Sequence, residues 1–214
     1  MQRLDRRGNQ ERHGHYFALL AVAAFWLSLP TSAAASGPPR HFRSLLELRH
    51  DNVVTQQWDL SCGAAALATI LTYEYGDAVS EKAVAEGLLR RTEPLKVKQR
   101  GGFSLLDLKR YAQSRGYDAI GLAELTVQQL VERAPAIVPM YAASTNHFVV
   151  FRGLLDNGRV ALADPAWGNR TIPLEEFEGA WVKHIAFLIG RADGDRRGNR
   201  LTLRPDDRLL PSDR

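Results

Sequence analysis

The 214-residue sequence predicts an α+β domain in which helices come first and an antiparallel sheet follows. Between residues 61 and 115, apolar residues recur at the spacing of helices in three separate segments. After residue 135 the pattern changes to short apolar runs that are separated by turn residues, which is typical of strands. This order favours α+β over the alternating pattern of a parallel α/β fold.

Three helices are predicted in the first half of the domain. Residues 61–75 (SCGAAALATILTYEY) are apolar nearly all round, which indicates a buried helix. Residues 80–90 form a second, amphipathic helix, for which Ser80 is a suitable N-cap. Ser104 and Asp107 make a Ser-x-x-Asp capping pattern at the start of the third helix.

The second half of the domain carries most of the predicted strands. The runs HFVVFRG and RVALA flank a loop with Asp156-Asn157-Gly158 at its tip, which is a hairpin signal. Strands are predicted at residues 52–56, 117–122, 135–141, 147–153, 159–163, 171–173 and 182–189, and short helices at 126–132 and 174–181.

The amino-acid composition is that of a globular domain and excludes several classes of protein. Hydrophobic residues make up 45% and charged residues 24%, as in a globular domain. The net charge is +4, but residues 1–35 hold four Arg, one Asp and one Glu, so they contribute +2 of it. The remaining charge is too small to indicate a nucleic-acid partner. One cysteine excludes an intramolecular disulfide and a zinc site built on several thiolates.

Residues 1–35 have the pattern of a signal peptide. An Arg-rich start is followed by an apolar run of 15 residues, YFALLAVAAFWLSLP, and then by Ala33-Ala34-Ala35. The alternative is an uncleaved membrane anchor, but the run is short of the roughly 20 residues that a membrane span needs. We therefore expect an exported protein, periplasmic or secreted, with cleavage after Ala35 and no membrane span in the mature chain.

The rest of the chain divides into three parts by composition. Residues 36–51 are a polar lead-in, and residues 52–190 form the predicted domain. Residues 191–214 contain seven Arg and five Asp with few apolar groups, which predicts a mobile charged tail.

Cys62 is the first candidate for chemistry. Unpaired thiols in an oxidising compartment are either buried and inert or kept for their reactivity. Cys62 lies where a turn enters the buried helix, and the dipole at a helix start favours a thiolate there. Gly63 would leave room for a substrate backbone. The alternative is that Cys62 is a small buried apolar side chain.

A thiolate nucleophile needs a base and a group that orients the base. His147 opens a strand after a small polar loop, whereas His184 lies inside a strand and His41 and His50 lie in the polar lead-in. Asp164 follows His147 by 17 residues across the hairpin, so it returns beside His147 and can fix its tautomer. The alternatives are a structural histidine and an Asp-Pro turn.

A glutamine before Cys62 could complete the site. The side-chain amide of Gln56 is a candidate second donor to an oxyanion, beside the backbone N–H of Cys62. Gln57 is its neighbour, and the sequence does not decide between the two. These groups need neither a metal nor a cofactor.

Three segments together resemble the bacteriocin-processing (double-glycine leader) peptidase family, over roughly residues 52–190. These are TQQWDLSCGAAALATIL, GGFSLLDLKRYAQSRGYDA and HFVVFRGLLDNGRVALADPAWG. The resemblance implies a papain-like fold, with Cys62 as nucleophile, His147 as general base and acid, Asp164 as its orienting group and Gln56 as oxyanion donor. It also implies small residues such as Gly or Ala beside the scissile bond.

Many members of that family are domains of exporters, whereas this sequence has no phosphate-binding loop and no membrane domain. A stand-alone exported member resembles components of gene clusters that secrete functional amyloid. We therefore expect an exported cysteine peptidase that acts on a peptide or secreted protein, in association with a secretion or fibre-assembly system. The alternatives are a catalytically silent binding or assembly factor with the same fold, and an amidase or acyl transferase on cell-wall peptides.

Overall fold

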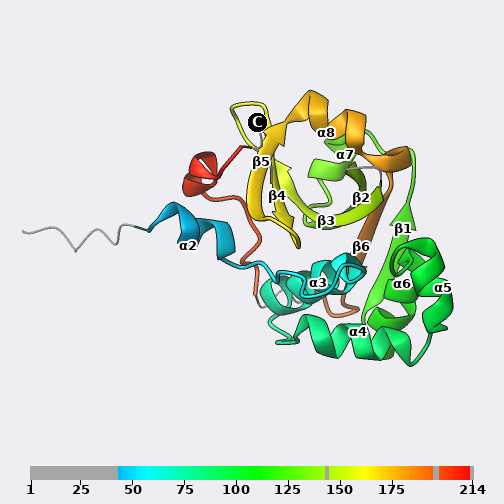
Figure 1. The fold of residues 1–214 in the computed structure, drawn as a ribbon. Coiled ribbons are helices and arrows are strands. Elements are labelled where there is room, and N and C mark those ends of the chain that lie inside the picture. The colour runs from blue at the N-terminus through cyan, green and yellow to red at the C-terminus, as the bar shows by residue number, and fades with distance from the viewer. Residues whose placement is uncertain (1–42, 143–144, 195–197, 213–214) are drawn as a thin grey trace, which may run out of the picture. The chain divides into compact units, whose positions relative to one another are not determined.

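The computed structural model describes residues 43–142, 145–194 and 198–212 (Figure 1). The predicted signal peptide at residues 1–35 lies outside the described residues. The helices are α2 (Leu45–His50), α3 (Cys62–Thr69), the π-helical turn η1 (Ile70–Glu74), α4 (Glu81–Leu89), α5 (Pro94–Arg100), α6 (Leu105–Ser114), α7 (Val127–Val131), α8 (Leu174–Ala180), and the 3₁₀ turns η2 (Val182–His184) and η3 (Pro205–Leu209).

The strands form one antiparallel sheet in the order β1-β6-β2-β3-β4-β5. They are β1 (Asp118–Leu122), β2 (Ala136–Ala142), β3 (Thr145–Leu154), β4 (Arg159–Asp164), β5 (Gly168–Pro173) and β6 (Ala186–Gly190). The predicted α+β class is therefore confirmed, with most of the helices before the sheet.

Both faces of the sheet are covered. Neighbouring residues of a strand point to opposite faces, and β3 shows this clearly. Val150 belongs to the apolar cluster that the sheet shares with α3, α4 and α6, whereas Phe151 belongs to the cluster that it shares with α7 and α8. Helix α3 packs against the sheet through the first cluster, and this packing places Cys62, the first residue of α3, near the sheet.

Local sequence signals account for the helix starts. Ser80 caps α4 by accepting a hydrogen bond from the backbone N–H of Ala83. Ser104 and Asp107 form the predicted capping box of α6. The long helix predicted over 61–75 is confirmed as α3 followed by η1.

Two predicted strands differ from the structure. The strand predicted over 52–56 is absent from the described residues, because Asn52 lies in a turn with a φ of 54° and the backbone donors that follow it go elsewhere. Val54 donates to the side chain of Thr69 and Gln56 to the carbonyl of Pro165. The strand predicted over 182–189 begins only at Ala186, after η2.

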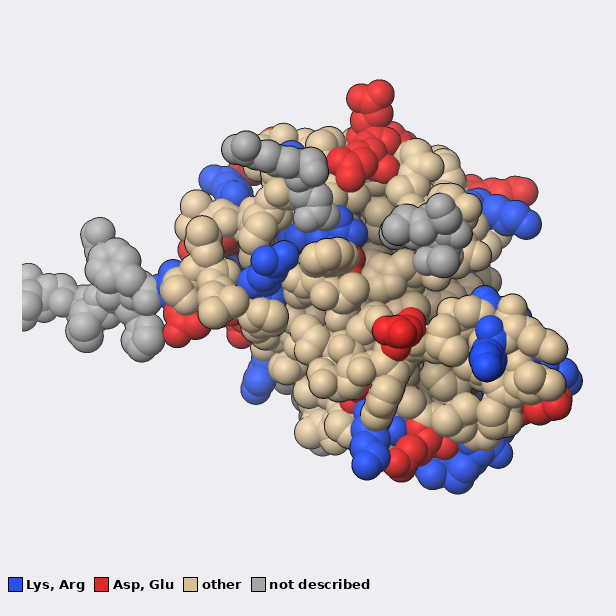
Figure 2. All heavy atoms as spheres, in the orientation of Figure 1, with Lys and Arg blue, Asp and Glu red and all other residues tan. Residues whose placement is uncertain are grey.

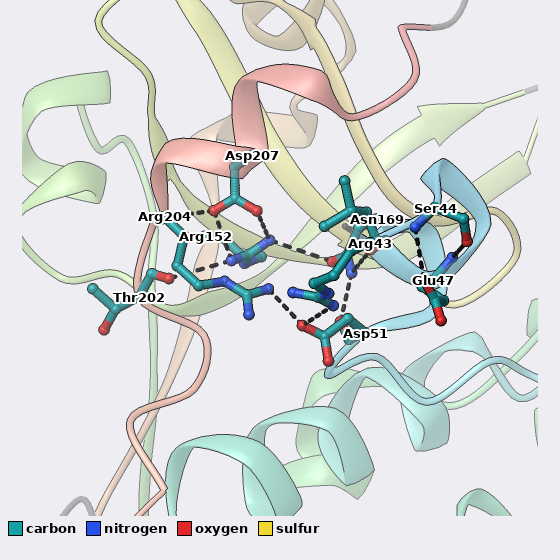
Figure 3. A network of polar contacts seen from close by, with 10 residues as sticks. Arg43, Ser44, Glu47, Asp51, Arg152, Asn169, Thr202, Arg204 and Asp207 are labelled. Carbon is teal, nitrogen blue, oxygen red and sulfur yellow. Dashed lines mark hydrogen bonds and ion pairs between the residues drawn. The ribbon is translucent and has the colours of Figure 1, made fainter. Parts of the chain in front are cut away.

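The C-terminal segment corrects the prediction of a mobile tail over 191–214. Within residues 198–212, the side chains of Leu201 and Leu210 are buried. Asp207 forms a buried ion pair with Arg152 of β3 (Figure 3). Three charged side chains of this segment, Arg204, Asp207 and Arg208, therefore pair with residues outside it.

Among the described residues, no helix has the length and apolar character to cross a membrane. Figure 2 shows basic and acidic side chains interspersed on the visible face. This mixture fits the small net charge of the sequence.

Candidate active site

The first residue of α3 is Cys62, and its side chain is buried. The preceding Ser61 does not cap the helix with its side chain, which instead donates to the carbonyl of Trp58 at 2.6 Å. A Cβ atom on Gly63 would lie 3.2 Å from the ring of Phe148. The absence of a side chain at Gly63 therefore lets α3 approach β3 closely, which differs from the predicted role of making room for substrate.

The hairpin of β3 and β4 brings His147 and Asp164 together, as the sequence predicted. Val150 lies opposite Ala163, so Asp164 ends β4 beside the start of β3. The distance between His147 Nε2 and Asp164 Oδ1 is 2.7 Å. Cys62 lies close enough to the ring to raise the pKa of His147. The carboxylate and the imidazole are thus hydrogen-bonded to each other, with the Cys62 side chain nearby.

The charge state of His147 follows from these neighbours. Burial alone lowers the pKa of His147, but hydrogen bonds to Asp164 and Cys62, and the charges of both, raise it to about 9. The imidazole therefore carries a proton at neutral pH. An imidazolium beside a thiol favours the thiolate, which is the nucleophilic form of cysteine.

Asp164 is fully buried and ionised. Burial raises its pKa, but the hydrogen bond and charge of His147, the charge of Arg170 and the backbone N–H of Ala166 together lower it. Oδ1 accepts from Ala166 N–H at 2.8 Å as well as from His147, while Oδ2 accepts from Arg170 at 2.8 and 2.9 Å. Sequence reasoning missed Arg170, and nothing in its spacing from Asp164 distinguishes it from a surface arginine.

The two glutamines before Cys62 have different surroundings. The backbone N–H of Gln56 donates to Pro165 O at 2.8 Å, so Gln56 lies beside the loop that carries Asp164. Its side-chain Nε2 donates to the Trp58 carbonyl at 3.2 Å, which leaves the second hydrogen of that nitrogen for another acceptor. Gln57 is exposed, and its backbone N–H is directed to Glu81 of α4.

A cleft of about 500 Å³ opens beside the sulfur of Cys62. The loop between α5 and α6 lines one part of it, with Gly101, Gly102 and Phe103, and residues at η2 line another. Gly101 and Gly102 have φ angles of 74° and 147°, which favour glycine, so the loop can present its backbone to the cleft. An extended peptide could reach Cys62 through this opening.

Among the described residues, the other two histidines, His50 and His184, lie outside the site. The ring of His184 stacks on Trp181 with 4.7 Å between ring centroids, and its Nδ1 lies 3.1 Å from the carbonyl of Leu125. His50 lies in the last turn of α2, and His41 is outside the described residues. Within the described part of the chain, no group of His, Cys, Asp and Glu side chains could hold a metal ion.

Comparison with known proteins shows the family of the chain. Residues 50–193 match the Peptidase C39 family, and the chain belongs to this family of cysteine peptidases. It is 38% identical over 189 residues to the probable functional amyloid protease FapD of Pseudomonas aeruginosa, with 84% of this chain and 82% of that protein covered. It is 33% identical over 175 residues to the protein of the same name from Pseudomonas fluorescens, covering 80% and 76% of the two chains.

Solved structures support the papain-like fold. A double-glycine motif protease of an AMS/PCAT transporter, in complex with a leader peptide, is 28% identical with a TM-score of 0.52, and the match covers 64% of this chain and 89% of that one. The peptidase domain of Streptococcus ComA is 22% identical with a TM-score of 0.53, covering 65% and 97%, and shows the fold alone. Residues near both ends of this chain, including η3, lie outside the family match.

Proposed function

We propose that this cysteine peptidase cleaves peptide bonds with Cys62, His147 and Asp164 as a catalytic triad, and that it processes an exported component of a functional amyloid. The observation that supports the triad most directly is the 2.7 Å contact between His147 and Asp164, with Cys62 close enough to raise the pKa of His147. The two relatives from Pseudomonas, each named a probable functional amyloid protease, support the substrate.

The reaction follows from the charge states of the triad. The Cys62 thiolate attacks the peptide carbonyl and forms a tetrahedral oxyanion. His147 then donates its proton to the leaving amine, which leaves a thioester on the sulfur. The neutral imidazole takes a proton from water, and the hydroxide releases the second product. Asp164 holds the ring in position and stabilises its charged form.

The oxyanion needs donors, and the start of α3 provides one. The backbone N–H of Cys62 lies at the first turn of the helix, where the Ser61 side chain makes no capping bond. The free hydrogen on Gln56 Nε2 is the proposed second donor, because Gln56 lies beside the Asp164 loop.

The charged form of His147 predicts how Cys62 reacts with iodoacetamide. At pH 6 an ordinary thiol with a pKa near 8.5 is roughly 0.3% thiolate, so its alkylation is slow. With an imidazolium whose pKa is about 9, the wild type should react at least about 10-fold faster than His147→Ala at pH 6. The two rates should converge as the pH rises through about 9, because the ring loses its charge and ordinary thiols ionise.

The matched control for this experiment is His184→Ala. That variant removes an imidazole which contacts Leu125 and Trp181 but not Cys62, so its alkylation rate at pH 6 should equal that of the wild type. Equal, slow rates in all three proteins would contradict the proposed pairing and would favour a silent binding protein of the same fold.

Gln56→Ala should lower kcat by about 100-fold, with little change in the alkylation rate of Cys62. Gln57→Ala should keep at least half of the wild-type kcat, because its side chain is exposed and its backbone points to α4. Steady-state cleavage of a labelled peptide measures both. A large loss in Gln57→Ala with none in Gln56→Ala would reverse the assignment.

We also propose that the protein acts after export, because residues 1–35 have a signal-peptide pattern. In that case, the mature protein from a periplasmic fraction should begin at Ser36 when its N-terminus is sequenced. Recovery of the chain only from the cytoplasm, with Met1 retained, would overturn this part of the proposal.

A further inference from the structure

We propose that Arg170 is a positioning residue of this active site, which holds the Asp164 carboxylate in the orientation that His147 needs. The inference rests on the proposed triad and adds a fourth side chain behind it. Arg170 is buried and contacts the Asp164 carboxylate, so we place its action on Asp164 and not on the substrate.

The two carboxylate oxygens of Asp164 have separate partners. Oδ1 accepts from His147 Nε2 at 2.7 Å and from Ala166 N–H at 2.8 Å. Oδ2 accepts from Arg170 Nε at 2.9 Å and from Arg170 Nη2 at 2.8 Å. A carboxylate held on both oxygens cannot rotate about its terminal bond without breaking charge-assisted hydrogen bonds. Oδ1 is therefore kept toward the imidazole.

Strand register explains how Arg170 reaches this position. Across the β4–β5 pair, Leu162 lies opposite Arg170 and Asp164 lies opposite Gly168. Arg170 is thus the diagonal neighbour of Asp164 on the same face of the sheet, a distance that a long side chain spans. Both side chains are buried, and a buried carboxylate without a partner on its second oxygen would be costly.

The start of β5 is itself held by α2 and the residue that follows it. Asn169, next to Arg170, donates from Nδ2 to the carbonyl of Leu48 in α2 at 3.0 Å and to that of Asp51, just after α2, at 2.5 Å (Figure 3). Its Oδ1 accepts from Arg152 Nη1 at 3.4 Å. These contacts fix the backbone that carries Arg170, so its guanidinium stays in place behind Asp164.

The charged groups around Asp164 come from several elements. His147 reaches it from β3 and Arg170 from β5, while Cys62 of α3 acts through the imidazole. Arg49 of α2 donates to the backbone carbonyl of Trp167 in the same loop. Of these groups, Arg170 and His147 contact the carboxylate directly. Loss of Arg170 should therefore raise the pH at which Asp164 takes up a proton.

The test compares three variants of the full mature chain. Arg170→Met removes the charge and both donors, Arg170→Gln keeps a donor without the charge, and Arg170→Lys keeps the charge. Arg159→Met is the matched control, because Arg159 is a neighbouring sheet arginine that donates to Thr171 and to no catalytic group. For each protein, kcat, KM and the Cys62 alkylation rate are measured from pH 4 to 10, together with the melting temperature.

Arg170→Met should lower kcat by about 10- to 100-fold with KM within about twofold, as expected for loss of a hydrogen bond to a charged group. The acid limb of both pH profiles should move to higher pH, and Arg170→Lys should restore most of both effects. A purely structural arginine would lower the melting temperature but leave the pH profile of the folded protein unchanged, and that result would overturn the proposal.

Two further outcomes are informative. If Arg170→Met does not fold, a folded Arg170→Gln variant with the wild-type kcat and pH profile overturns the proposal in the same way. If His147→Ala leaves the wild-type alkylation rate unchanged, the triad itself is wrong, and that failure is visible without any Arg170 variant.

Discussion

Replacing Cys62 by alanine is expected to abolish peptide cleavage while leaving the fold intact. Cys62 is the only thiol of the chain, and its position at the start of α3 next to His147 makes it the proposed nucleophile. Loss of a nucleophile of this kind typically lowers kcat by about 10⁴-fold or more. The measurement is mass spectrometry of an exported fibre component after incubation with the wild type and with Cys62→Ala.

Stability provides the control for that experiment. The substitution removes one small buried atom, so the free energy of unfolding should fall by no more than about 1 kcal/mol. Circular dichroism and urea unfolding check this. Cleavage of the same bond at the wild-type rate by a folded Cys62→Ala protein would refute the proposed mechanism. Release of cell-wall peptides alone by the wild type would redirect the assignment to an amidase.

Asp207→Ala is expected to destabilise the protein by about 3–5 kcal/mol, because it leaves a buried guanidinium without its counterion. Nη1 and Nη2 of Arg152 each lie 2.9 Å from a different oxygen of Asp207, and both side chains are almost fully buried. The remaining donors of Arg152 go to the carbonyls of Leu201 and Thr202 and to Asn169. Urea unfolding at pH 7 measures the loss.

A matched control uses another Arg–Asp pair of the same segment. Arg208 contacts Asp156 with both side chains more than half exposed, so Asp156→Ala should change stability by less than about 1 kcal/mol. The double variant Arg152→Met/Asp207→Leu should recover much of the loss, since it removes both buried charges. An equal, small effect of Asp207→Ala and Asp156→Ala would show that the buried pair is not needed.

The core of the site was predictable because it depends on local signals. The turn before an apolar helix placed Cys62 at a helix start, and the hairpin length brought Asp164 back to His147. Both inferences use residues that are close in the chain. Arg170 was not predictable in this way, because its role depends on the register of β4 against β5, which the sequence pattern does not give.

The missed elements of the fold have a common physical reason. Helix α5 buries only Val97, and α2 buries only Leu48, so neither shows a helical repeat of apolar residues. The C-terminal segment has few apolar residues, and its main partner, Arg152, is 55 residues away from Asp207. The composition of residues 191–214 predicts how that segment behaves alone in water. It does not show that Asp207 has a buried counterion, Arg152, elsewhere in the chain.

The network in Figure 3 also bears on how the protein could be matured. Arg204 of the C-terminal segment and Arg43, which precedes α2, both contact Oδ2 of Asp51 at 2.7 Å. Trimming the chain back to residue 193, where the family match ends, would remove Arg204 and Asp207 together. Such a cut would leave the buried guanidinium of Arg152 without its counterion, so residues 198–212 are expected to remain in the folded protein.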